Sequence, residues 1–414
     1  MTAGGLVPDA ADVLIVGAGI IGLTIARRLV MAGCDSVVLV EKEEDLGMHA
    51  SGRNSGVLHA GIYYDPGSMK AKSCLNGNFL MRAYCREKEL PLRENGKVIV
   101  ARDEGELPAL RDLERRATAN GAKVEMIDER QLAEIEPNAR TVGKALFSPY
   151  TACVDPLAVL ASLRRDLEAG GKARVVTGCL FTGVRGSRTA VTSRGNISFR
   201  KFVNASGAYC DRVAHLFGAG MEYRLIPFKG VYRKLRKGLS HSVRGNIYPV
   251  PDIRNPFLGV HISSNVHGEV VLGPTAIPAF GRENYGFFSG IDREGPSIAF
   301  SDAILFLRNP KFRQVALTEP RKYRSRDFFR DAARLMIALS PSDIEPSEKV
   351  GIRAQLVDWR TKDLVMDFRV IAQGDALHIL NPISPAFTSS MDIAETLVRE
   401  HFAVSGTGRA GGPA

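Results

Sequence analysis

The sequence predicts an α/β fold that begins with a Rossmann-like nucleotide-binding domain, and three consecutive features near the N-terminus predict it. An apolar strand-like run leads into a glycine motif and a helical run, and a second strand-like run then ends in an acidic residue. In order, these features are 12–16, Gly17-Ala18-Gly19-Ile20-Ile21-Gly22 with the helical run 23–32, and 37–40 followed by Glu41. A strand, glycine turn, helix and strand in this order make a βαβ unit that binds a dinucleotide.

Each position of the glycine motif has a physical role in such a unit. Gly17 permits the tight turn, Gly19 lets the backbone approach the pyrophosphate, and Gly22 lets the helix pack close to the strand. Ile20 and Ile21 begin the helix, whose positive end faces the phosphates. A lone Gly-x-Gly-x-x-Gly is usually only a tight turn, but here both strands, the helix and the acid are in register.

Glu41 and Lys42 end the second strand, about 20 residues beyond the last motif glycine, where the fingerprint requires an acid. The Glu41 carboxylate would accept hydrogen bonds from the ribose hydroxyls of the adenosine. Its negative charge disfavours a 2′-phosphate and therefore NADP.

Composition bounds the remaining possibilities. With 414 residues, two domains are expected, and the net charge of +10 comes from basic residues spread along the chain. The densest basic stretches, 233–237 and 321–330, favour a solvated or membrane-proximal face over a nucleic-acid site, and they would also suit an acidic substrate.

The six cysteines show no metal-ligand or disulfide spacing, so we expect no metal site and a reducing cytosol. No signal peptide or membrane-spanning run is visible, so we expect a soluble cytoplasmic protein or one bound peripherally to the inner face of the membrane.

The remaining elements follow from periodicity and from stop signals. Helices are expected over 73–90, 108–119, 155–169, 210–217 and 328–338. Strands are expected over 97–101, 174–177, 180–184, 190–192 and 199–204. The region from 223 to about 290 is expected to be mostly strands, and two further strands are expected around Gly374-Asp375. The glycine turn 205–208 indicates a return to the nucleotide-binding domain.

The implied plan is a cofactor domain made of discontinuous pieces, with a mixed-sheet substrate domain inserted between them. The cofactor domain takes 1–90, 150–220 and 345–404, the substrate domain takes 91–149 and 221–344, and 405–414 is a disordered tail. The segment 47–64 is rich in glycine, histidine and tyrosine without helical or strand periodicity, and this is not the composition of a linker.

Several blocks of this chain together resemble the L-2-hydroxyglutarate dehydrogenase family of the FAD-dependent, D-amino-acid-oxidase-like superfamily. The blocks are the N-terminal fingerprint, 51–64, 226–230, 245–251, 256–261, 351–355 and 381–386. The resemblance runs from about 12 to 400 and implies oxidation of L-2-hydroxyglutarate to 2-oxoglutarate with FAD. Electrons would pass to a quinone or another acceptor, with possible peripheral membrane contact. Two departures, Lys229 in place of arginine and Phe387 in place of a small residue, leave the exact substrate open.

The resemblance also implies site residues. Those expected to hold FAD, besides Gly17 to Gly22, Glu41 and Lys42, are Ser51, Arg53, Asn54, Ser55, Ser206, Gly207, Gly351 and Ser384. His59 is the expected base for the substrate hydroxyl, because an imidazole with a pKa near neutrality suits that task, although a single histidine is often structural.

The carboxylates of a 2-hydroxy acid require cations. Arg353 is expected first, because a guanidinium grips a carboxylate bidentately, and Lys229 second, although either could be a surface cation or a flavin-phosphate partner. Further expected pocket residues are Tyr63, Asn246, Tyr248 and His261; the tyrosines could equally be packed core residues.

Three other functions compete with this interpretation. The nearest alternative is a flavin oxidase of an amino acid, an N-methyl amino acid or glycerol phosphate, which would release hydrogen peroxide. A nucleotide-binding protein without chemistry conflicts with the histidine, tyrosines and cations outside the phosphate motif. An NAD dehydrogenase is disfavoured because the glycine-rich segment follows the fingerprint.

Overall fold

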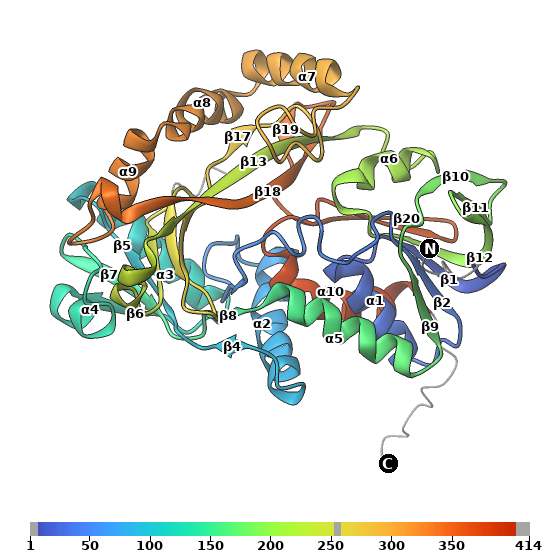
Figure 1. Cartoon of the computed structure of the whole chain (residues 1–414), viewed down its shortest axis with the longest axis horizontal. Coiled ribbons are helices and arrows are strands. Elements are labelled where there is room, and N and C mark those ends of the chain that lie inside the picture. Colours follow the sequence, from blue (N-terminus) through green and yellow to red (C-terminus); the bar gives the residue numbers. More distant parts are fainter. Residues whose placement is uncertain (1–6, 252–257, 403–414) are drawn as a thin grey trace.

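Two large β-sheets and a small one between them form the framework of the chain (Figure 1). The computed structural model describes residues 7–251 and 258–402. Part of the block 256–261 and the expected tail 405–414 therefore lie outside the described residues.

The first sheet has eight strands and carries the nucleotide-binding motif. Its path is β10-β11-β12-β1-β2-β9, with β21 beside β12 and β20 beside β21. Its strands are β1 (Ala10–Val16), β2 (Val37–Val40), β9 (Ala173–Val176), β10 (Phe181–Arg185), β11 (Thr189–Thr192), β12 (Gly195–Asn204), β20 (Arg369–Gln373) and β21 (Ala376–Leu380). Strands β21, β12, β1, β2 and β9 are parallel neighbours.

Both faces of this sheet are buried, which explains why β1 is apolar from Val13 to Val16. Val13 and Ile15 pack in one hydrophobic cluster, and Leu14 and Val16 pack in another on the opposite face. Figure 1 shows α1 (Ile20–Met31), α5 (Pro156–Ala169) and α10 (Ala386–His401) together against the sheet, and α2 (Met69–Glu87) packs on α10.

The second sheet has ten strands and is mostly antiparallel. Its path is β19-β18-β13-β16-β15-β14-β5-β7-β6, with β17 beside β13. Its strands are β5 (Lys97–Val100), β6 (Glu125–Asp128), β7 (Lys144–Ser148), β13 (Tyr223–Leu235), β14 (Asn246–Pro249), β15 (His261–Ser264), β16 (Val270–Gly273), β17 (Ile277–Pro278), β18 (Ile344–Asp358) and β19 (Asp363–Leu364).

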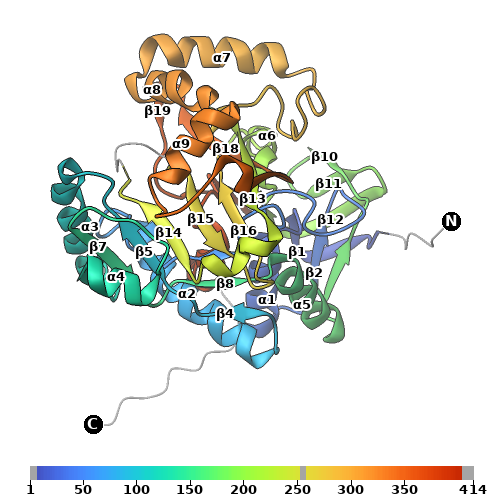
Figure 2. The same cartoon turned by 60° about the vertical axis from the view of Figure 1, so that its left-hand side comes forward.

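Helices border this sheet at its two ends. In Figure 1, α7 (Gly295–Arg308), α8 (Pro310–Thr318) and α9 (Ser325–Ala333) run above the long strands β13 and β18, and Figure 2 shows α7 at the outer edge of the molecule. At the other end are α3 (Leu107–Ala119) and α4 (Glu129–Ile135), while the short α6 (Cys210–His215) follows β12.

The third sheet consists of β3 (Val57–Leu58), β8 (Ala152–Val154) and β4 (Leu92–Arg93). It fixes the start of the segment that contains His59, because β3 pairs with β8 through Val57 and Leu58.

The structure differs from the expected elements in several respects. The region 223–290 forms strands only as far as Pro278, and the helices α4, α7, α8 and α10 and the strands β6, β7 and β8 were not predicted. In addition, β18 and β19 belong to the ten-stranded sheet, although 345–404 was assigned to the cofactor domain. We keep the two-domain division as a proposal, with its last boundary moved beyond Leu364.

Candidate active site

A cavity of about 1060 Å³ lies where the two large sheets meet. Its walls come from the turns after β1, β2 and β12, the segment before β3, strand β18 and the start of α10. This volume is at the upper end of the range for ligand sites, so the cavity can hold a large ligand together with a small one.

The turn after β1 is shaped so that only glycine fits it. Gly17 has φ of +100°, and an added Cβ would lie 2.5 Å from the carbonyl oxygen of Ala205. At Gly22 an added Cβ would lie 2.0 Å from the carbonyl oxygen of Gly17, so α1 packs directly on the turn. Gly22 is therefore a packing residue and, unlike Gly17, Gly19, Ile20 and Ile21, does not line the cavity.

Glu41 lies beside this turn. One carboxylate oxygen accepts a hydrogen bond from the backbone N–H of Ala18 at 3.0 Å, and the other accepts from the N–H of Glu43 at 3.1 Å. A carboxylate has about four lone-pair sites, so Glu41 keeps capacity to accept from the hydroxyls of a ligand in the cavity that it lines.

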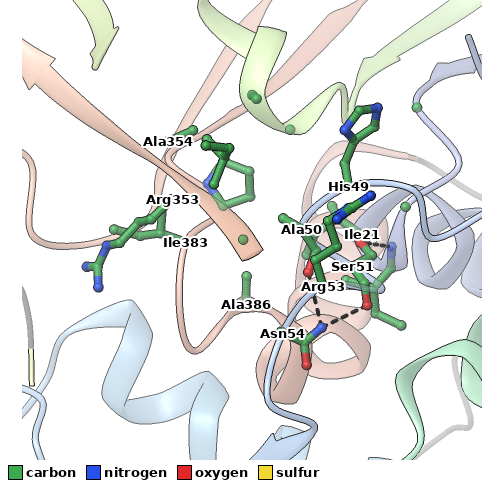
Figure 3. Close-up of a pocket in the computed structure, with 18 of the residues that line it drawn as sticks. Ile21, His49, Ala50, Ser51, Arg53, Asn54, Arg353, Ala354, Ile383 and Ala386 are labelled. Atoms are coloured by element: carbon green, nitrogen blue, oxygen red, sulfur yellow. Dashed lines mark hydrogen bonds between the residues drawn. The ribbon is translucent and has the colours of Figure 1, made fainter. Parts of the chain in front are cut away.

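The segment 47–56 is folded by its own side chains. Ser51 Oγ accepts from the backbone N–H of Ile20 at 3.0 Å and thereby joins this segment to the start of α1. Asn54 donates to the carbonyl oxygens of Ala50 and Ser51, as Figure 3 shows, and Arg53 donates to the carbonyl oxygen of Met48. These bonds hold a polar segment without helix or strand against the cavity.

The other predicted cofactor residues line the same cavity. They are Lys42, Ser55, Ser206, Gly207, Gly351 and Ser384. Ser206 donates from its hydroxyl to Asn204 Oδ1 at 2.6 Å, and at Gly351 an added Cβ would lie 3.1 Å from the carbonyl oxygen of Arg53.

Lys42 is held by acidic neighbours. Its ammonium pairs with Glu283 at 2.6 Å and with Glu43, and His49 lies 2.8 Å away. Within the described ranges, one group of side chains has metal-ligand spacing: Glu43, His49 and Glu283. The Lys42 ammonium pairs with both of these carboxylates.

His59 is half-buried in the cavity wall. Its backbone N–H donates to Thr388 Oγ1 at 3.1 Å, and its Nε2 lies 3.5 Å from Ser384 Oγ. Its Nδ1 has no hydrogen-bond partner among the residues that the structure describes. Burial, reinforced by the charges of Lys97 and His261, lowers the pKa of His59 to about 3, so the imidazole is neutral at pH 7.

Arg353, Tyr248 and His261 also line the cavity. In Figure 3 Arg353 projects from β18 beside Ile383, away from the side where Ser51, Arg53 and Asn54 gather. The rings of Tyr248 and His261 stack with centroids 3.9 Å apart. Burial lowers the pKa of Arg353 to about 10 and that of His261 to about 4, so Arg353 stays charged at pH 7.

Three of the predicted substrate residues, Lys229, Asn246 and Tyr63, do not line the cavity. Lys229 donates to the carbonyl oxygen of Gly286 and does not line the cavity. Phe228 lies opposite Arg353 in the β13–β18 register and lines the cavity, so Lys229, one position further, points to the other face of the sheet. Asn246 donates to the carbonyl oxygen of Gly96 at 2.7 Å and joins β14 to β5.

Tyr63 belongs to the core behind the cavity. Its ring packs in a hydrophobic cluster with Ile99 and Tyr248, and its buried hydroxyl has no hydrogen-bond partner among the described residues. The sequence analysis left open whether this tyrosine lines the pocket or fills the core, and the structure places it in the core.

The contribution of α10 to the cavity was not predicted from the sequence. Residues Ala386, Phe387 and Thr388 line the cavity at the first turn of this helix, which has no side-chain cap. The positive end of the helix dipole therefore faces the cavity and favours negative charge there. Phe387 is half-buried in this wall, so the departure from a small residue does fall at the site.

The family model described as "FAD dependent oxidoreductase" matches residues 12–399. The mitochondrial L-2-hydroxyglutarate dehydrogenase of Nematostella vectensis is 38% identical over 92% of this chain and 88% of that protein. The L-2-hydroxyglutarate dehydrogenase of Indibacter alkaliphilus is 35% identical over 93% of this chain and 97% of that protein.

Solved structures resemble the chain in fold. The L-alpha-glycerophosphate oxidase of Mycoplasma pneumoniae, solved with FAD bound, has a TM-score of 0.73 and 22% identity, covering 95% of this chain and 94% of that one. The glycine oxidase of Geobacillus kaustophilus has a TM-score of 0.70 and 19% identity, covering 95% of each chain. These comparisons confirm the predicted D-amino-acid-oxidase-like α/β fold, the FAD cofactor and the recognised family.

Proposed function

Because the chain belongs to the FAD dependent oxidoreductases and, within them, to the family of the L-2-hydroxyglutarate dehydrogenases, we propose that it oxidises L-2-hydroxyglutarate to 2-oxoglutarate. The observation that carries this proposal is the end-to-end likeness to dehydrogenases of that name. The cavity supports it, since the dinucleotide-binding turn, the neutral imidazole of His59 and the Arg353 cation share one space.

The residues of the cavity fit FAD. The glycine cradle at Gly17, the free capacity of the Glu41 carboxylate and the uncapped start of α10 would hold its phosphates, ribose and ring system. When bound, FAD supplies the acceptor for the hydride that leaves the substrate carbon.

His59 is the proposed base. Its neutral imidazole can take the proton of the substrate hydroxyl, and Nδ1 is the ring nitrogen without a partner within the described part of the chain. An imidazolium with a pKa of about 3 forms reluctantly, so the negative carboxylates of the substrate would have to stabilise it. Arg353 is the proposed partner of the carboxylate next to the hydroxyl.

Oxidase activity toward an amino acid or glycerol phosphate is the weaker candidate, because the oxidases resemble this chain only in fold. Steady-state assays with L-2-hydroxyglutarate, glycine and glycerol phosphate separate the two functions. We expect turnover of L-2-hydroxyglutarate with a quinone analogue and little peroxide. Peroxide formation from glycine or glycerol phosphate, without use of the hydroxy acid, would contradict the proposal.

We also propose that a quinone in an anionic bilayer accepts the electrons and that the protein docks there peripherally. The supporting feature is a set of exposed apolar side chains from 287 to 323, which we call the apolar surface: Phe287, Phe288, Phe300, Leu307 and Tyr323. The Phe287 ring lies 4.6 Å from that of Phe288 and 6.0 Å from that of Tyr323. Phe300 and Leu307 are seven residues apart in α7 and so lie on one side of that helix. Figure 2 shows α7 at the outer edge of the molecule.

Exposed cations lie close to these apolar side chains in the sequence and would complement anionic lipid. They are Arg293, Arg308, Lys311, Arg321, Arg324 and Arg326. Aromatic residues with basic neighbours are typical of interfacial binding. No helix among the described residues is long and apolar enough to cross a membrane.

Vesicle sedimentation tests the docking. The wild type should sediment with phosphatidylglycerol vesicles at low salt, and the double variant Phe287→Ser/Phe288→Ser should lose most of this binding. The control is Met31→Ser, which removes an exposed apolar side chain at the end of α1. Equal sedimentation of the double variant, or dimer formation through this surface instead, would contradict the docking but not the reaction.

A further inference from the structure

A buried lysine lies directly behind the substrate end of the cavity. Lys97 is the first residue of β5 and is only 1% exposed. Its Nζ has neither a hydrogen-bond partner nor a salt bridge among the described residues. Two tyrosine rings surround it, with Nζ 4.5 Å from the centroid of Tyr63 and 5.0 Å from that of Tyr248.

The strand pattern makes a lysine unexpected at this position. The next residues, Val98, Ile99 and Val100, are all buried and apolar, and Ile99 shares its face of β5 with Lys97. Ile99, Tyr63 and Tyr248 belong to one hydrophobic cluster, which α3 covers. Contacts with two aromatic rings recover only part of the free energy that burial of an ammonium group costs. A role in folding therefore does not explain this residue.

Lys97 is connected to the cavity through Tyr248. That ring stacks on His261, and both residues line the cavity, while Lys97 lies against the same ring from the core side. His59 is close enough for the charge of Lys97 to affect it, and the Tyr63 hydroxyl nearby is also buried without a recorded partner among the described residues. The Lys97 ammonium therefore lies against the rings of Tyr63 and Tyr248, on the core side of the wall to which His59 and His261 belong.

We propose that Lys97 and the hydroxyl of Tyr63 form the subsite that binds the second carboxylate of the substrate. Both groups lie just behind the cavity wall in this structure, so the Tyr248 ring must move when the substrate binds. This inference rests on the proposed function and specifies it: Arg353 binds the carboxylate next to the hydroxyl, and Lys97 selects dicarboxylates over monocarboxylates. Lys97 takes the role that the sequence analysis assigned to Lys229.

The test compares two unreactive acids on the FAD-loaded enzyme. Glutarate carries both carboxylates and pentanoate carries one, and their binding is followed by the change in the flavin absorption spectrum. Lys97→Met keeps the length of the side chain and removes the charge. It should weaken glutarate binding by about 100-fold, the loss expected for a hydrogen bond to a charged group, and change pentanoate binding by less than about 3-fold.

Two further variants make the result decisive. Lys229→Met changes a lysine that points to the face of β13 opposite the cavity-lining Phe228 and donates to Gly286, and it should leave both affinities unchanged. Lys97→Met should fold at least as stably as the wild type, since it removes an unpaired buried charge, and Lys97→Gln provides a second substitution if it does not. The steady-state KM for L-2-hydroxyglutarate should rise in parallel with the loss of glutarate binding.

The outcomes separate this inference from the proposed function. If Lys97→Met and Lys97→Gln bind glutarate as tightly as the wild type, the subsite is wrong, although the oxidation of L-2-hydroxyglutarate stands. If the wild type binds neither glutarate nor L-2-hydroxyglutarate, both proposals fail. Equal weakening of glutarate and pentanoate would also contradict a subsite for the second carboxylate.

Discussion

His59 lies in a setting that keeps its imidazole neutral, and this gives a test of its role as base. In His59→Asn the side chain can no longer take the hydroxyl proton, so kcat should fall by about 10²- to 10⁴-fold. The flavin content, measured by absorbance, should stay at the wild-type level. The control is His267→Asn, which changes an exposed histidine paired with Asp155. Near-normal turnover of His59→Asn would remove this residue from the mechanism.

The lowered pKa of His59 also predicts a pH profile. A base must be unprotonated in the free enzyme, and burial moves the pKa of His59 from 6.5 to about 3. Between pH 8 and pH 5 the imidazole therefore stays neutral, and kcat/KM should show no acid limb that belongs to this group. A limb with a midpoint near pH 6.5 that disappears in His59→Asn would contradict the burial of this imidazole.

Arg353 is the proposed partner of the first carboxylate. Arg353→Met should raise the KM for L-2-hydroxyglutarate by about 10- to 100-fold, because a charged hydrogen-bonding group is lost. Arg360→Met, which removes an exposed arginine beyond the same strand, serves as the control. Unchanged kinetic constants in Arg353→Met would place it outside the substrate site.

The two lysines show what residue-level sequence reasoning can reach. Lys229 was predicted because a cation follows Phe228 in a family block, but the register of β13 with β18 points it away from the cavity. Lys97 gave no signal, because it stands in an apolar strand far from the other site residues in sequence. Only the pairing of β5 with β14 brings it beside Tyr248.

At the scale of elements, the contact of α2 with α10 supports the site. An added Cβ at Gly77 on α2 would lie 2.3 Å from the carbonyl oxygen of Thr388, whose hydroxyl accepts from the backbone N–H of His59. Gly77→Ala should therefore displace the start of α10, lower the thermal unfolding temperature by several degrees and reduce kcat.

The matched control for this contact is Gly170→Ala at the end of α5, where an added Cβ meets no atom within 4 Å. This variant should keep both the unfolding temperature and the activity. If Gly77→Ala behaved in the same way, the α2–α10 contact would not determine the position of the catalytic segment.

The elements around the glycine motif were predictable because local signals agree with their packing. Asp155 followed by Pro156 predicted the start of α5, and Asp155 does accept from the backbone N–H groups of Leu157 and Ala158. The same signal begins α8, where Asn309 accepts from the N–H of Phe312, but the sequence analysis overlooked it. The start of α10 has no such cap, and its position depends on contacts with α1 and α2 that are distant in sequence.

For the molecule as a whole, buried basic groups predict how stability depends on pH. Burial lowers the pKa of His59 to about 3 and those of His261 and His378 to about 4, and it lowers the pKa of Lys70 and Lys97 to about 7. The unfolded chain therefore binds more protons than the folded chain from pH 4 to 6.5 through the histidines, and from pH 7 to 10.5 through the lysines.

These basic groups contribute stability that rises with pH across both windows, because the state that binds fewer protons is favoured as protons become scarce. Asp302, whose pKa is raised to about 7 by burial, acts in the opposite direction below pH 7, but it is one group against three histidines. The thermal unfolding temperature of the FAD-loaded protein should increase from pH 5 to pH 8. Lys97→Met should flatten the part of this increase above pH 7, and Lys229→Met should not. An unfolding temperature that falls over this range would contradict the burial of these groups.

The central claim is that one cavity unites an FAD site with a site for L-2-hydroxyglutarate. Anaerobic mixing of the FAD-loaded protein with substrate, followed by stopped-flow absorbance, tests it most directly because no electron acceptor is needed. We predict rapid and complete bleaching of the flavin by L-2-hydroxyglutarate, with 2-oxoglutarate formed in equal amount, and no bleaching by the D enantiomer on the same timescale. A flavin that stays oxidised with L-2-hydroxyglutarate but is bleached by an amino acid or by glycerol phosphate would contradict the claim.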